Sequence, residues 1–320
     1  MRRQKNKFKT IYIGGGTPSA LEPFLLDDLL FYCSLLINKD ADYEFTVEMN
    51  VEDITESKLK ILKENKVNRI SIGIQTFDNN ILKKLNRNYT KEIAIEKVNL
   101  AKKFFNNINL DLIYAMPFSN IEILRKDLEE LLKLNVKHIS TYSLQICSGT
   151  TFYNENIKEL DQDETRKQYD LILNTLRANG YKRYEVSNFA RDKCFSKHNL
   201  CYWKDDKYYS IGVGASGYIG NIRYTNTKNI LEYIGQEKIK SYEMITKKDD
   251  IEYFLLTNLR LEDGFKFIDF NKRFNSDFLK RYKVKISHLI LEKLIIIDQN
   301  SIRCSDDGIM LLDKVLEELI

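Results

Sequence analysis

The sequence predicts an α/β protein built around a curved or barrel-like parallel sheet that surrounds a polar cavity. Strand and helix patterns alternate through residues 1–180, several strands carry polar residues on one face, and the pattern changes after residue 180. A chain of 320 residues can bury a large core and hold one large domain together with a smaller one.

Apolar segments that alternate with helical patterns predict the strands at 10–15, 44–50, 69–75, 108–117 and 138–146. Helices are predicted near 22–38, 55–65, 78–105, 121–134 and 161–179. This repetition is typical of parallel strands with helices outside, arranged as an open sheet or as a barrel.

Side-chain parity favours the barrel. In RISIGIQ the three isoleucines share one face, whereas Ser71, Gly73 and Gln75 share the other. EFTVEMN and INLDLIY divide in the same way, with Glu48 and Asp111 on their polar faces. An open sheet between two helix layers is apolar on both faces, and a closed eight-stranded barrel has an apolar interior. Each polar residue could instead cap a loop, but the matching parity of three strands favours a polar cavity.

The pattern changes after residue 180. Segments 181–190 and 208–220 are predicted as strands of an extension, with HNLCYW between them. From about residue 247, three short helices, a strand–turn–strand in LIIIDQNSIRCS and a final helix predict a small winged-helix-like domain. We therefore expect three parts: 1–180, 181–246 and 247–320.

Composition narrows the class of protein. The net charge is +4, and Lys and Glu alternate along the predicted helices, which favours a solvated surface over a nucleic-acid footprint. KISHLILEKL is too apolar for an exposed DNA-recognition helix, so no nucleic-acid partner is predicted. No run has the length of a membrane span, and the basic first ten residues lack the apolar core of a signal peptide. Five scattered cysteines argue against a disulfide framework, so a cytoplasmic protein is expected.

A glycine-rich stretch, TIYIGGGTPSAL, joins the first predicted strand to a helix. Its three glycines allow backbone to approach a ligand closely and to adopt a positive φ. Thr17 fits a helix N-cap with Pro18 at the first helical position. The stretch lacks both the G-x-G-x-x-G pattern of dinucleotide sites and the lysine of a phosphate loop. By itself it fits either a ligand loop or a tight turn.

Other segments resolve this ambiguity by their order along the chain: YIGGGTPSAL, VEMN, RISIGIQTFDNNILKKLNR, LDLIYAMP, ISTYSLQICSGTTFY, YEVSNFA, HNLCYW and GVGASGYIGNIRYTN. Together they closely resemble the radical S-adenosylmethionine (SAM) proteins of the oxygen-independent coproporphyrinogen III oxidase family, and most of all its HemW-type heme chaperones. The resemblance runs from about residue 8 to the C-terminus. It implies a partial (β/α)6 TIM-like barrel followed by a small C-terminal helical domain.

The resemblance also implies a set of residues that contact SAM: Gly15, Gly16, Thr17, Glu48, Gln75, Arg87 and Asp111. The chemistry agrees, because a zwitterionic amino acid joined to a ribose needs carboxylates for its ammonium and hydroxyl groups and a cation for its carboxylate. Without the resemblance, Arg87 would be interpreted as a cation at the end of a helix.

The segment HNLCYW matches the H-N-x-x-Y-W motif of the heme-chaperone branch, which implies a heme site at His198, Asn199, Tyr202 and Trp203. Imidazole is a common axial ligand of heme iron, and an aromatic pair can stack on a macrocycle. On residue type alone, His198 could be structural and Trp203 could belong to the core.

The family's defining Cys-x3-Cys-x2-Cys motif, which holds a 4Fe–4S cluster, is absent from this sequence. We expect it upstream of the glycine stretch, with the first strand–helix unit, either because a start codon was assigned too far downstream or because the chain is a truncated descendant. A bare sheet edge favours the first explanation. Cys194, His198 and Cys201 imitate the motif in their spacing, but they follow the barrel, so no cluster ligands are predicted in this chain.

The sequence therefore predicts a cytosolic heme chaperone that binds heme and delivers it to hemoproteins. One alternative is oxidative decarboxylation of coproporphyrinogen III. Another is a heme-binding remnant without radical chemistry, because a chain without cluster ligands is not expected to be an active radical enzyme. A recipient protein could bring the chaperone to the membrane periphery, and a homodimer is compatible with the sequence.

Overall fold

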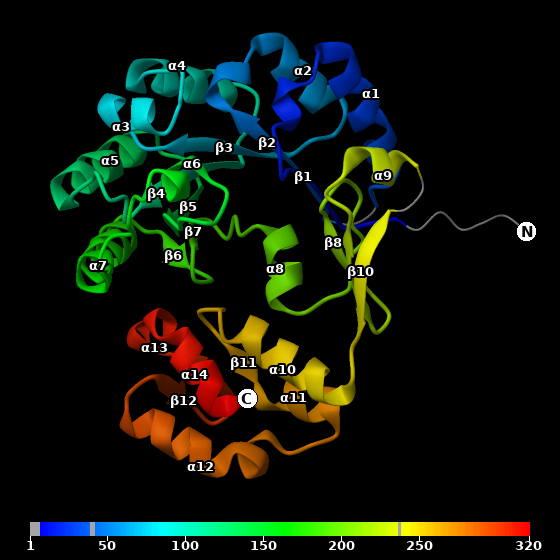
Figure 1. Ribbon diagram of the computed structural model, residues 1–320, viewed down its shortest axis with the longest axis vertical. Helices are drawn as coiled ribbons and strands as arrows, with labels where there is room; N and C mark the ends of the chain where they lie inside the picture. Colours follow the sequence, from blue (N-terminus) through cyan, green and yellow to red (C-terminus); the bar gives the residue numbers. More distant parts are fainter. Residues whose placement is uncertain (1–6, 39–41, 236–237) are drawn as a thin grey trace, which may run out of the picture. The chain divides into compact units, whose positions relative to one another are not determined.

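The computed structural model describes residues 7–38, 42–235 and 238–320. They form two compact units, which can be followed by colour in Figure 1. The first, here called the sheet unit, runs to Arg183 and includes Ser187–His198. The second, the C-terminal unit, consists of Tyr184–Val186 and Asn199–Ile320. The three-part division at residues 180 and 246 stays a prediction.

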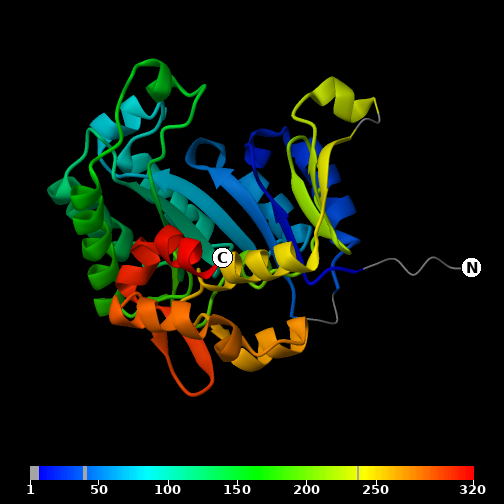
Figure 2. The ribbon, with the colours of Figure 1, turned by 60° about the horizontal axis from the view of Figure 1, so that its bottom comes forward.

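A seven-stranded sheet in the order β1-β2-β3-β4-β5-β7-β6 organises the sheet unit. Its strands are β1 (Thr10–Ile13), β2 (Glu44–Asn50), β3 (Arg69–Gln75), β4 (Ile108–Tyr114), β5 (His138–Ser143), β6 (Lys182–Arg183) and β7 (Asn188–Ala190). Strands β1 to β5 are parallel, whereas β7 runs antiparallel to both β5 and β6. Figure 2 shows the blue and cyan strands side by side. The predicted parallel α/β sheet is thus confirmed.

Helices follow the strands along the chain. They are α1 (Pro23–Ser34), α2 (Glu56–Glu64), α3 (Asn79–Lys84), α4 (Lys91–Lys102), α5 (Ile121–Lys133), α6 (Thr151–Asn154) and α7 (Gln162–Ala178), with 3-10 turns η1 (Pro18–Ala20) and η2 (Val51–Asp53). In Figure 1, α1, α2, α4 and α5 lie on the outer side of β1 to β5. Helix α8 (Lys197–Trp203) begins in the sheet unit and ends in the C-terminal unit.

The apolar faces of the central strands form the core beneath these helices. Several of their side chains are fully buried: Phe45, Val47, Ile70, Ile72, Ile74, Leu110 and Leu112. Helix α5 contributes Leu124, Leu128 and Leu131 at helical spacing. Burial of each such side chain stabilises the fold by about 1.5–3 kcal/mol. The opposite faces of the same strands are polar, as the parity predicts.

The single helix predicted near 78–105 is wrong. The structure has two helices there, α3 and α4, because Asn86 lies in the left-handed region with φ 58°. Asparagine tolerates this conformation better than most residues and commonly ends a helix. The capping side chain of Asp78 begins α3, and α4 begins after Thr90.

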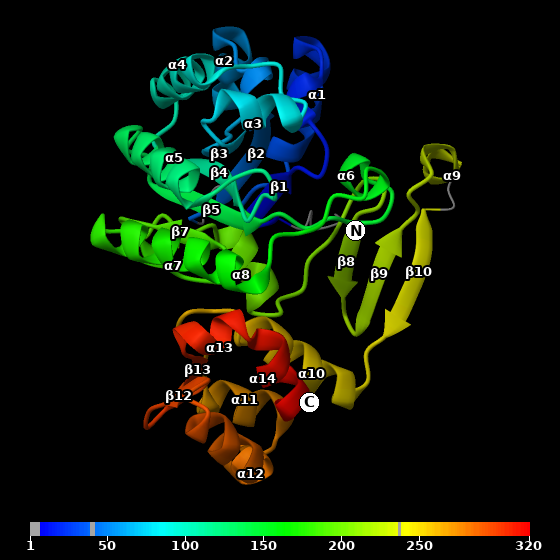
Figure 3. The same ribbon diagram turned by 60° about the vertical axis from the view of Figure 1, so that its left-hand side comes forward.

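The C-terminal unit contains two small antiparallel sheets. One has the order β10-β9-β8 and consists of β8 (Ser216–Ile219), β9 (Ile222–Asn226) and β10 (Ile239–Met244), shown in Figure 3. The other, β11-β13-β12, consists of β11 (Phe265–Lys266), β12 (Ile295–Ile297) and β13 (Ser301–Cys304). The helices are α9 (Ile230–Ile234), α10 (Lys247–Asn258), α11 (Phe267–Phe274), α12 (Phe278–Leu291), α13 (Asp306–Met310) and α14 (Leu312–Leu319).

This arrangement confirms the predicted small C-terminal domain of three helices, a strand–turn–strand and a final helix, which is divided into α13 and α14. Two strand predictions before it are wrong in extent. Segment 181–190 is a hairpin of two short strands, and segment 208–220 forms a strand only at Ser216–Ile219, with an isolated bridge from Tyr208 to Tyr218. Gly212 and Gly214 have φ of +115° and +72°, which interrupts a strand. Among the described residues, no helix has the length and apolarity that a membrane crossing requires.

Candidate functional site

The inner face of the sheet is lined by polar side chains. Strand register places them in rows that cross the sheet, and neighbours in a row are paired: Thr10–Glu44, Tyr12–Thr46–Arg69, Glu48–Ser71–Asn109 and Gly73–Asp111–Ser140. Many are buried, including Glu44 at 3% exposed and Arg69 at 2%. Buried polar groups need partners, so the hydrogen bonds of this face show how each side chain is held.

Glu48 is the first of the predicted residues whose contacts explain the glycine stretch. Its Oε1 accepts a hydrogen bond of 2.7 Å from the Tyr12 hydroxyl, and its Oε2 accepts one of 3.0 Å from the Gly15 N–H. A Cβ at Gly14 would lie 2.4 Å from Glu48 Cδ, so any other residue there would displace the Glu48 carboxylate. Gly15 has φ +80°, which also favours glycine. The bare backbone therefore admits a carboxylate from the next strand.

Thr17 occupies the predicted N-cap position, with Pro18 as the first residue of the 3-10 turn η1, but its side chain caps no N–H of that turn. The helix α1 begins only at Pro23. The Thr17 Oγ1 instead accepts a 3.4 Å hydrogen bond from Asn50 Nδ2 at the end of β2. Gly16 is exposed, and a Cβ there would meet nothing within 4 Å. Both residues remain on the loop beside Glu48.

Asp111 lies in a buried hydrogen-bond network on β3, β4 and β5. Asn109 Nδ2 donates to Asp111 Oδ1 at 2.6 Å and to Ser71 Oγ at 2.7 Å, and Asn109 Oδ1 accepts from Ser140 Oγ at 3.0 Å. His138 Nδ1 lies 2.6 Å from the same Asn109 oxygen. Burial raises the pKa of Asp111 to about 6, with a smaller contribution from the Glu48 charge, because burial disfavours the charged form.

Gln75 is the last residue of β3, and Arg87 is linked to the same strand end through Tyr89. Gln75 has φ 70°, at a shift of the β3–β4 register, and its Nε2 lies 2.6 Å from where a Gly73 Cβ would stand. The half-buried Arg87 has a buried Nε that finds no hydrogen-bond partner among the described residues. Its charge acts on Tyr89, whose hydroxyl donates to the Gly73 and Ile74 carbonyls at 3.1 and 2.9 Å.

A hydrogen bond joins Gly15 to Glu48, and the Glu48 charge acts on Asp111. Gln75 and Arg87 are linked to this group through contacts at the end of β3. Two carboxylates can accept an ammonium group and hydroxyl groups, and the unpartnered Nε of Arg87 suits a carboxylate. The residues present therefore fit the polar groups of SAM.

A second set of contacts holds the beginning of α8. The Glu44 carboxylate accepts hydrogen bonds from Lys197 N at 2.8 Å, His198 N at 3.1 Å and Ser196 Oγ at 3.2 Å. Sequence reasoning missed Glu44, although it shares the parity of Glu48 on the polar face of β2. That parity was the signal in the sequence. The sequence could not show that Glu44 binds the backbone of α8, more than 150 residues away.

These bonds present His198 to the first strand. Its imidazole stacks on the Tyr12 ring, with centroids 5.3 Å apart and planes 25° apart, and its Nδ1 lies 3.0 Å from Thr10 Oγ1. Burial lowers the pKa of His198 to about 4, so the imidazole is neutral at pH 7. A neutral imidazole is the form of histidine that can bind iron.

Asn199, Tyr202 and Trp203 belong to the C-terminal unit. Tyr202 packs edge-to-face on Tyr208 at 4.7 Å. The half-buried Trp203 lies under Arg260, whose guanidinium carbon is 5.6 Å from the ring centroid, and its indole N–H finds no acceptor among the described residues. A ring that is only partly packed and has an unmet donor suits a ligand contact better than a core position.

Sequence reasoning also missed Arg69, a nearly fully buried guanidinium on the inner face. Among the described residues, its Nε has no hydrogen-bond partner and Arg69 forms no ion pair. Its charge adds to burial in lowering the pKa of His138 and of His198. The signal was its parity with Ser71, but an arginine at the first position of a strand is ordinarily expected at the surface.

In the described part of the chain, no three His, Cys, Asp or Glu side chains lie close enough to share a metal ion. Cys194 is half-buried and its thiol lies 3.8 Å from the Asp192 carbonyl, while His198 turns to Tyr12. The described cysteines therefore do not fit a three-thiolate cluster.

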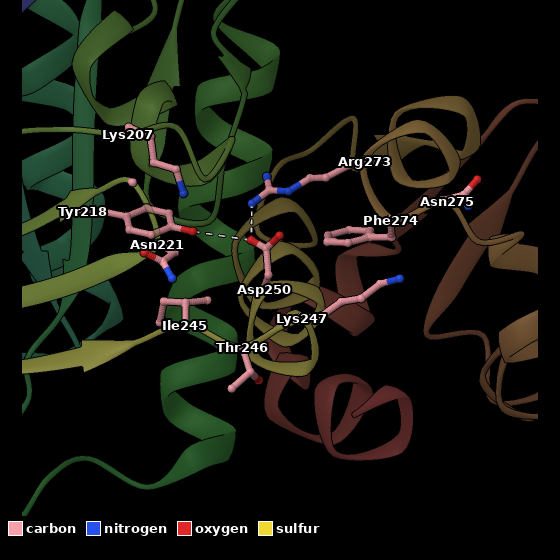
Figure 4. A pocket seen from close by; sticks show the side chains of 11 residues that line it. Lys207, Tyr218, Asn221, Ile245, Thr246, Lys247, Asp250, Arg273, Phe274 and Asn275 are labelled. Atoms are coloured by element: carbon pink, nitrogen blue, oxygen red, sulfur yellow. Dashed lines mark hydrogen bonds and ion pairs between the residues drawn. The ribbon is translucent and has the colours of Figure 1, made fainter.

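A pocket of about 350 Å³ lies in the C-terminal unit, and none of the predicted site residues lines it (Figure 4). Its wall includes Lys207, Tyr218, Asp250 and Arg273. Arg273 forms ion pairs with Asp250 and with the buried Asp205, which also pairs with Arg223. The charged groups at this pocket are largely engaged with one another, which indicates a structural cluster.

Comparisons with known proteins agree with this geometry. Residues 1–134 match the model of the Radical SAM superfamily, and residues 245–311 match the HemN C-terminal domain. The chain is 38% identical to the heme chaperone HemW of Lactococcus lactis over 98% of this chain and 85% of that protein. It is 35% identical to the heme chaperone HemW of Bacillus subtilis over 80% of this chain and 70% of that protein.

Among solved structures, the coproporphyrinogen III oxidase HemN of Escherichia coli superimposes with a TM-score of 0.83 at 19% identity, over 98% of this chain and 78% of that one. At this identity the likeness shows the fold, and it confirms the predicted radical SAM fold. The relatives, which cover most of both chains, show more: this chain belongs to the HemW heme chaperone family of radical SAM proteins.

Proposed function

We propose that this protein binds heme through His198 and delivers it to hemoproteins in the cytosol. The observation that carries the proposal is the presentation of His198: Glu44 holds the backbone of α8, and Tyr12 and Thr10 hold a neutral imidazole. A side chain in this state can bond iron without first losing a proton. Membership of the HemW family supports heme as the cargo.

The aromatic residues that follow His198 supply the second part of the proposed site. Tyr202 is 37% exposed, and Trp203 has a buried donor without a partner among the described residues. Flat aromatic surfaces of this kind stack on a macrocycle. Asn199 completes the motif as a hydrogen-bonding side chain. Decarboxylation of coproporphyrinogen has no observation of its own in its favour, because the likeness to the oxidase shows only the fold.

The experiment is a titration of the purified chain with hemin. We expect a shift of the Soret band for the wild type, and at least a tenfold weaker affinity with an altered spectrum for His198→Ala. His288→Ala is the matched control, since His288 is an exposed histidine on α12. An unshifted Soret band, or one that His198→Ala leaves as in the wild type, would contradict the heme assignment.

We further propose that SAM binds at the carboxyl ends of the strands, with Gly15, Gly16 and Thr17 against its methionyl part. Glu48 and Asp111 would accept its ammonium and hydroxyl groups, Gln75 would supply its amide, and Arg87 would pair with its carboxylate.

Calorimetry with SAM tests the second site. We expect Glu48→Ala and Asp111→Ala each to weaken binding at least tenfold, because each removes a carboxylate that faces the ligand. Glu96→Ala, an exposed glutamate on α4, is the control and is expected to bind as the wild type does. Equal affinities in all four proteins would refute the assignment of these two carboxylates.

A further inference from the structure

One side chain contacts both proposed sites. The face of the Tyr12 ring stacks on His198, and its hydroxyl donates to Glu48 Oε1 at 2.7 Å. The other oxygen of the same carboxylate accepts from the backbone of Gly15. A continuous set of contacts therefore runs from the glycine loop through Glu48 and Tyr12 to the imidazole.

The position of Tyr12 is fixed by the sheet. It lies on β1, on the inner face, beside Thr46 of β2 in the parallel register. Burial raises the pKa of the Tyr12 hydroxyl well above its usual range, and the Glu48 charge raises it further, so the hydroxyl keeps its proton. It is consequently a constant donor to Glu48, and bonds from hydroxyl to carboxylate are among the stronger hydrogen bonds in proteins.

His198 depends on this arrangement for its orientation. Thr10 engages Nδ1 in the plane of the ring, whereas Tyr12 supports the face of the ring, so the two contacts together set where Nε2 points. Partners that orient an imidazole also tune its strength as a metal ligand. If Tyr12 tilts, the stack changes, and among the described residues only the hydrogen bond to Glu48 restrains the hydroxyl end of Tyr12.

We propose that Tyr12 is a positioning residue for His198, and that the Glu48–Tyr12 hydrogen bond connects the state of the SAM site to the heme ligand. The inference rests on the proposed heme function. An ammonium group at Glu48 competes with Tyr12 for the carboxylate and thereby loosens the support of His198. Because such a coupling is reciprocal, heme at His198 also changes the affinity at Glu48.

A double-mutant cycle tests the connection without any need for SAM. We expect Tyr12→Phe, which keeps the stacked ring and loses the hydroxyl, to weaken hemin binding about threefold to tenfold and to change the spectrum of the histidine-bound heme. Glu48→Ala should have an effect of similar size and sign. In the double variant the two effects should not multiply, because both remove the same bond. Tyr12→Leu, which also removes the stack, should weaken binding further.

Tyr181→Phe is the matched control. Tyr181 is a buried tyrosine of the sheet unit whose hydroxyl donates to the Val136 carbonyl at 2.5 Å, so this variant loses a comparable bond elsewhere. We expect its unfolding temperature to fall as that of Tyr12→Phe does, while its hemin affinity and spectrum stay as in the wild type. This comparison separates positioning from general stability.

The outcomes distinguish the inference from the function on which it rests. If the wild type binds hemin through His198 but Tyr12→Phe and Glu48→Ala change nothing, or their effects multiply, the inference fails alone. If no hemin binds, the proposed function fails, and NMR of the imidazoles still decides the connection. The chain has three histidines, so their signals are readily assigned. His198 signals that move in Glu48→Ala but not when Tyr12 is already Phe support it, and unmoved signals overturn it.

Discussion

At the scale of single residues, the inner face depends on a close approach of backbone and carboxylate. Gly14 leaves room for Glu48, and Gly15 supplies both a positive φ and an N–H donor. The sequence alone could not distinguish this arrangement from a tight turn, because the glycines are local and Glu48 is supplied by the next strand. The contact assigns a separate role to each of the two glycines.

Gly14→Ala should therefore displace Glu48 from both of its partners. We expect a loss of about 1–3 kcal/mol in the free energy of unfolding, since two hydrogen bonds are broken and a methyl group is forced into occupied space. Urea denaturation measures it. Gly16→Ala is the control and should unfold as the wild type does, because a Cβ at Gly16 meets nothing within 4 Å. Equal losses in both variants would contradict this account of the loop.

At the scale of elements, a buried carboxylate fastens helix α5 to the end of β3. Asp127 is 2% exposed among the leucines of α5. Its oxygens accept from Thr76 Oγ1 at 2.7 Å and from Phe77 N at 2.8 Å. Burial outweighs these bonds and raises the pKa of Asp127 to about 6. Between the ordinary pKa of an aspartate and about pH 6, Asp127 is therefore protonated in the folded protein and ionised in the unfolded chain.

The contribution of Asp127 to stability should fall as the pH rises. A carboxyl whose pKa is raised on folding stabilises the fold below its unfolded pKa, and this contribution is lost as the pH rises through the folded value. We expect the stability of the wild type relative to Asp127→Asn to fall by about 2–3 kcal/mol between pH 4 and pH 6.5, since each pKa unit corresponds to about 1.4 kcal/mol. Urea denaturation of both proteins across this range measures it, and a constant difference would refute it.

At the scale of the whole molecule, each unit has a core of its own. The C-terminal unit packs phenylalanine rings edge-to-face and stacked around Phe270, which is fully buried. Its β10-β9-β8 sheet and helix α11 are joined by Asp205, whose carboxylate pairs with Arg223 of β9 and with Arg273 of α11. Asp205 is buried, whereas both guanidinium groups keep some contact with solvent.

Asp205→Ala should consequently destabilise the C-terminal unit. We expect a loss of about 2–4 kcal/mol, somewhat below the cost of breaking a fully buried pair, because two partly buried cations lose their common partner. Thermal unfolding measures it, with Glu317→Ala as control, since that exposed glutamate of α14 forms no ion pair among the described residues. Indistinguishable unfolding temperatures for the two variants would show that Asp205 is dispensable.

The sequence by itself determined the strands whose patterns are strong. The bounds of β2 and β3 agree with their predictions, and the parity of Ser71, Glu48 and Asp111 correctly placed polar residues on one face. Period-two alternation reports burial directly, because neighbouring side chains in a strand point to opposite faces. Predictions failed where one residue changes the backbone, as Asn86 does between α3 and α4. The periodicity of apolar residues does not predict a single residue with a left-handed backbone conformation.

Only the tertiary structure decided which distant residues meet. Tyr12 gave no signal in the sequence beyond an aromatic residue in a strand, yet it contacts His198, 186 positions later (198 minus 12). Glu44 likewise holds the backbone of α8 across more than 150 residues. The physical reason is that local patterns depend on the burial of neighbouring residues, whereas these contacts depend on how strands pair and where the chain returns to the sheet. The sequence determined which polar side chains line the inner face, and the packing of the chain determined which residues they contact.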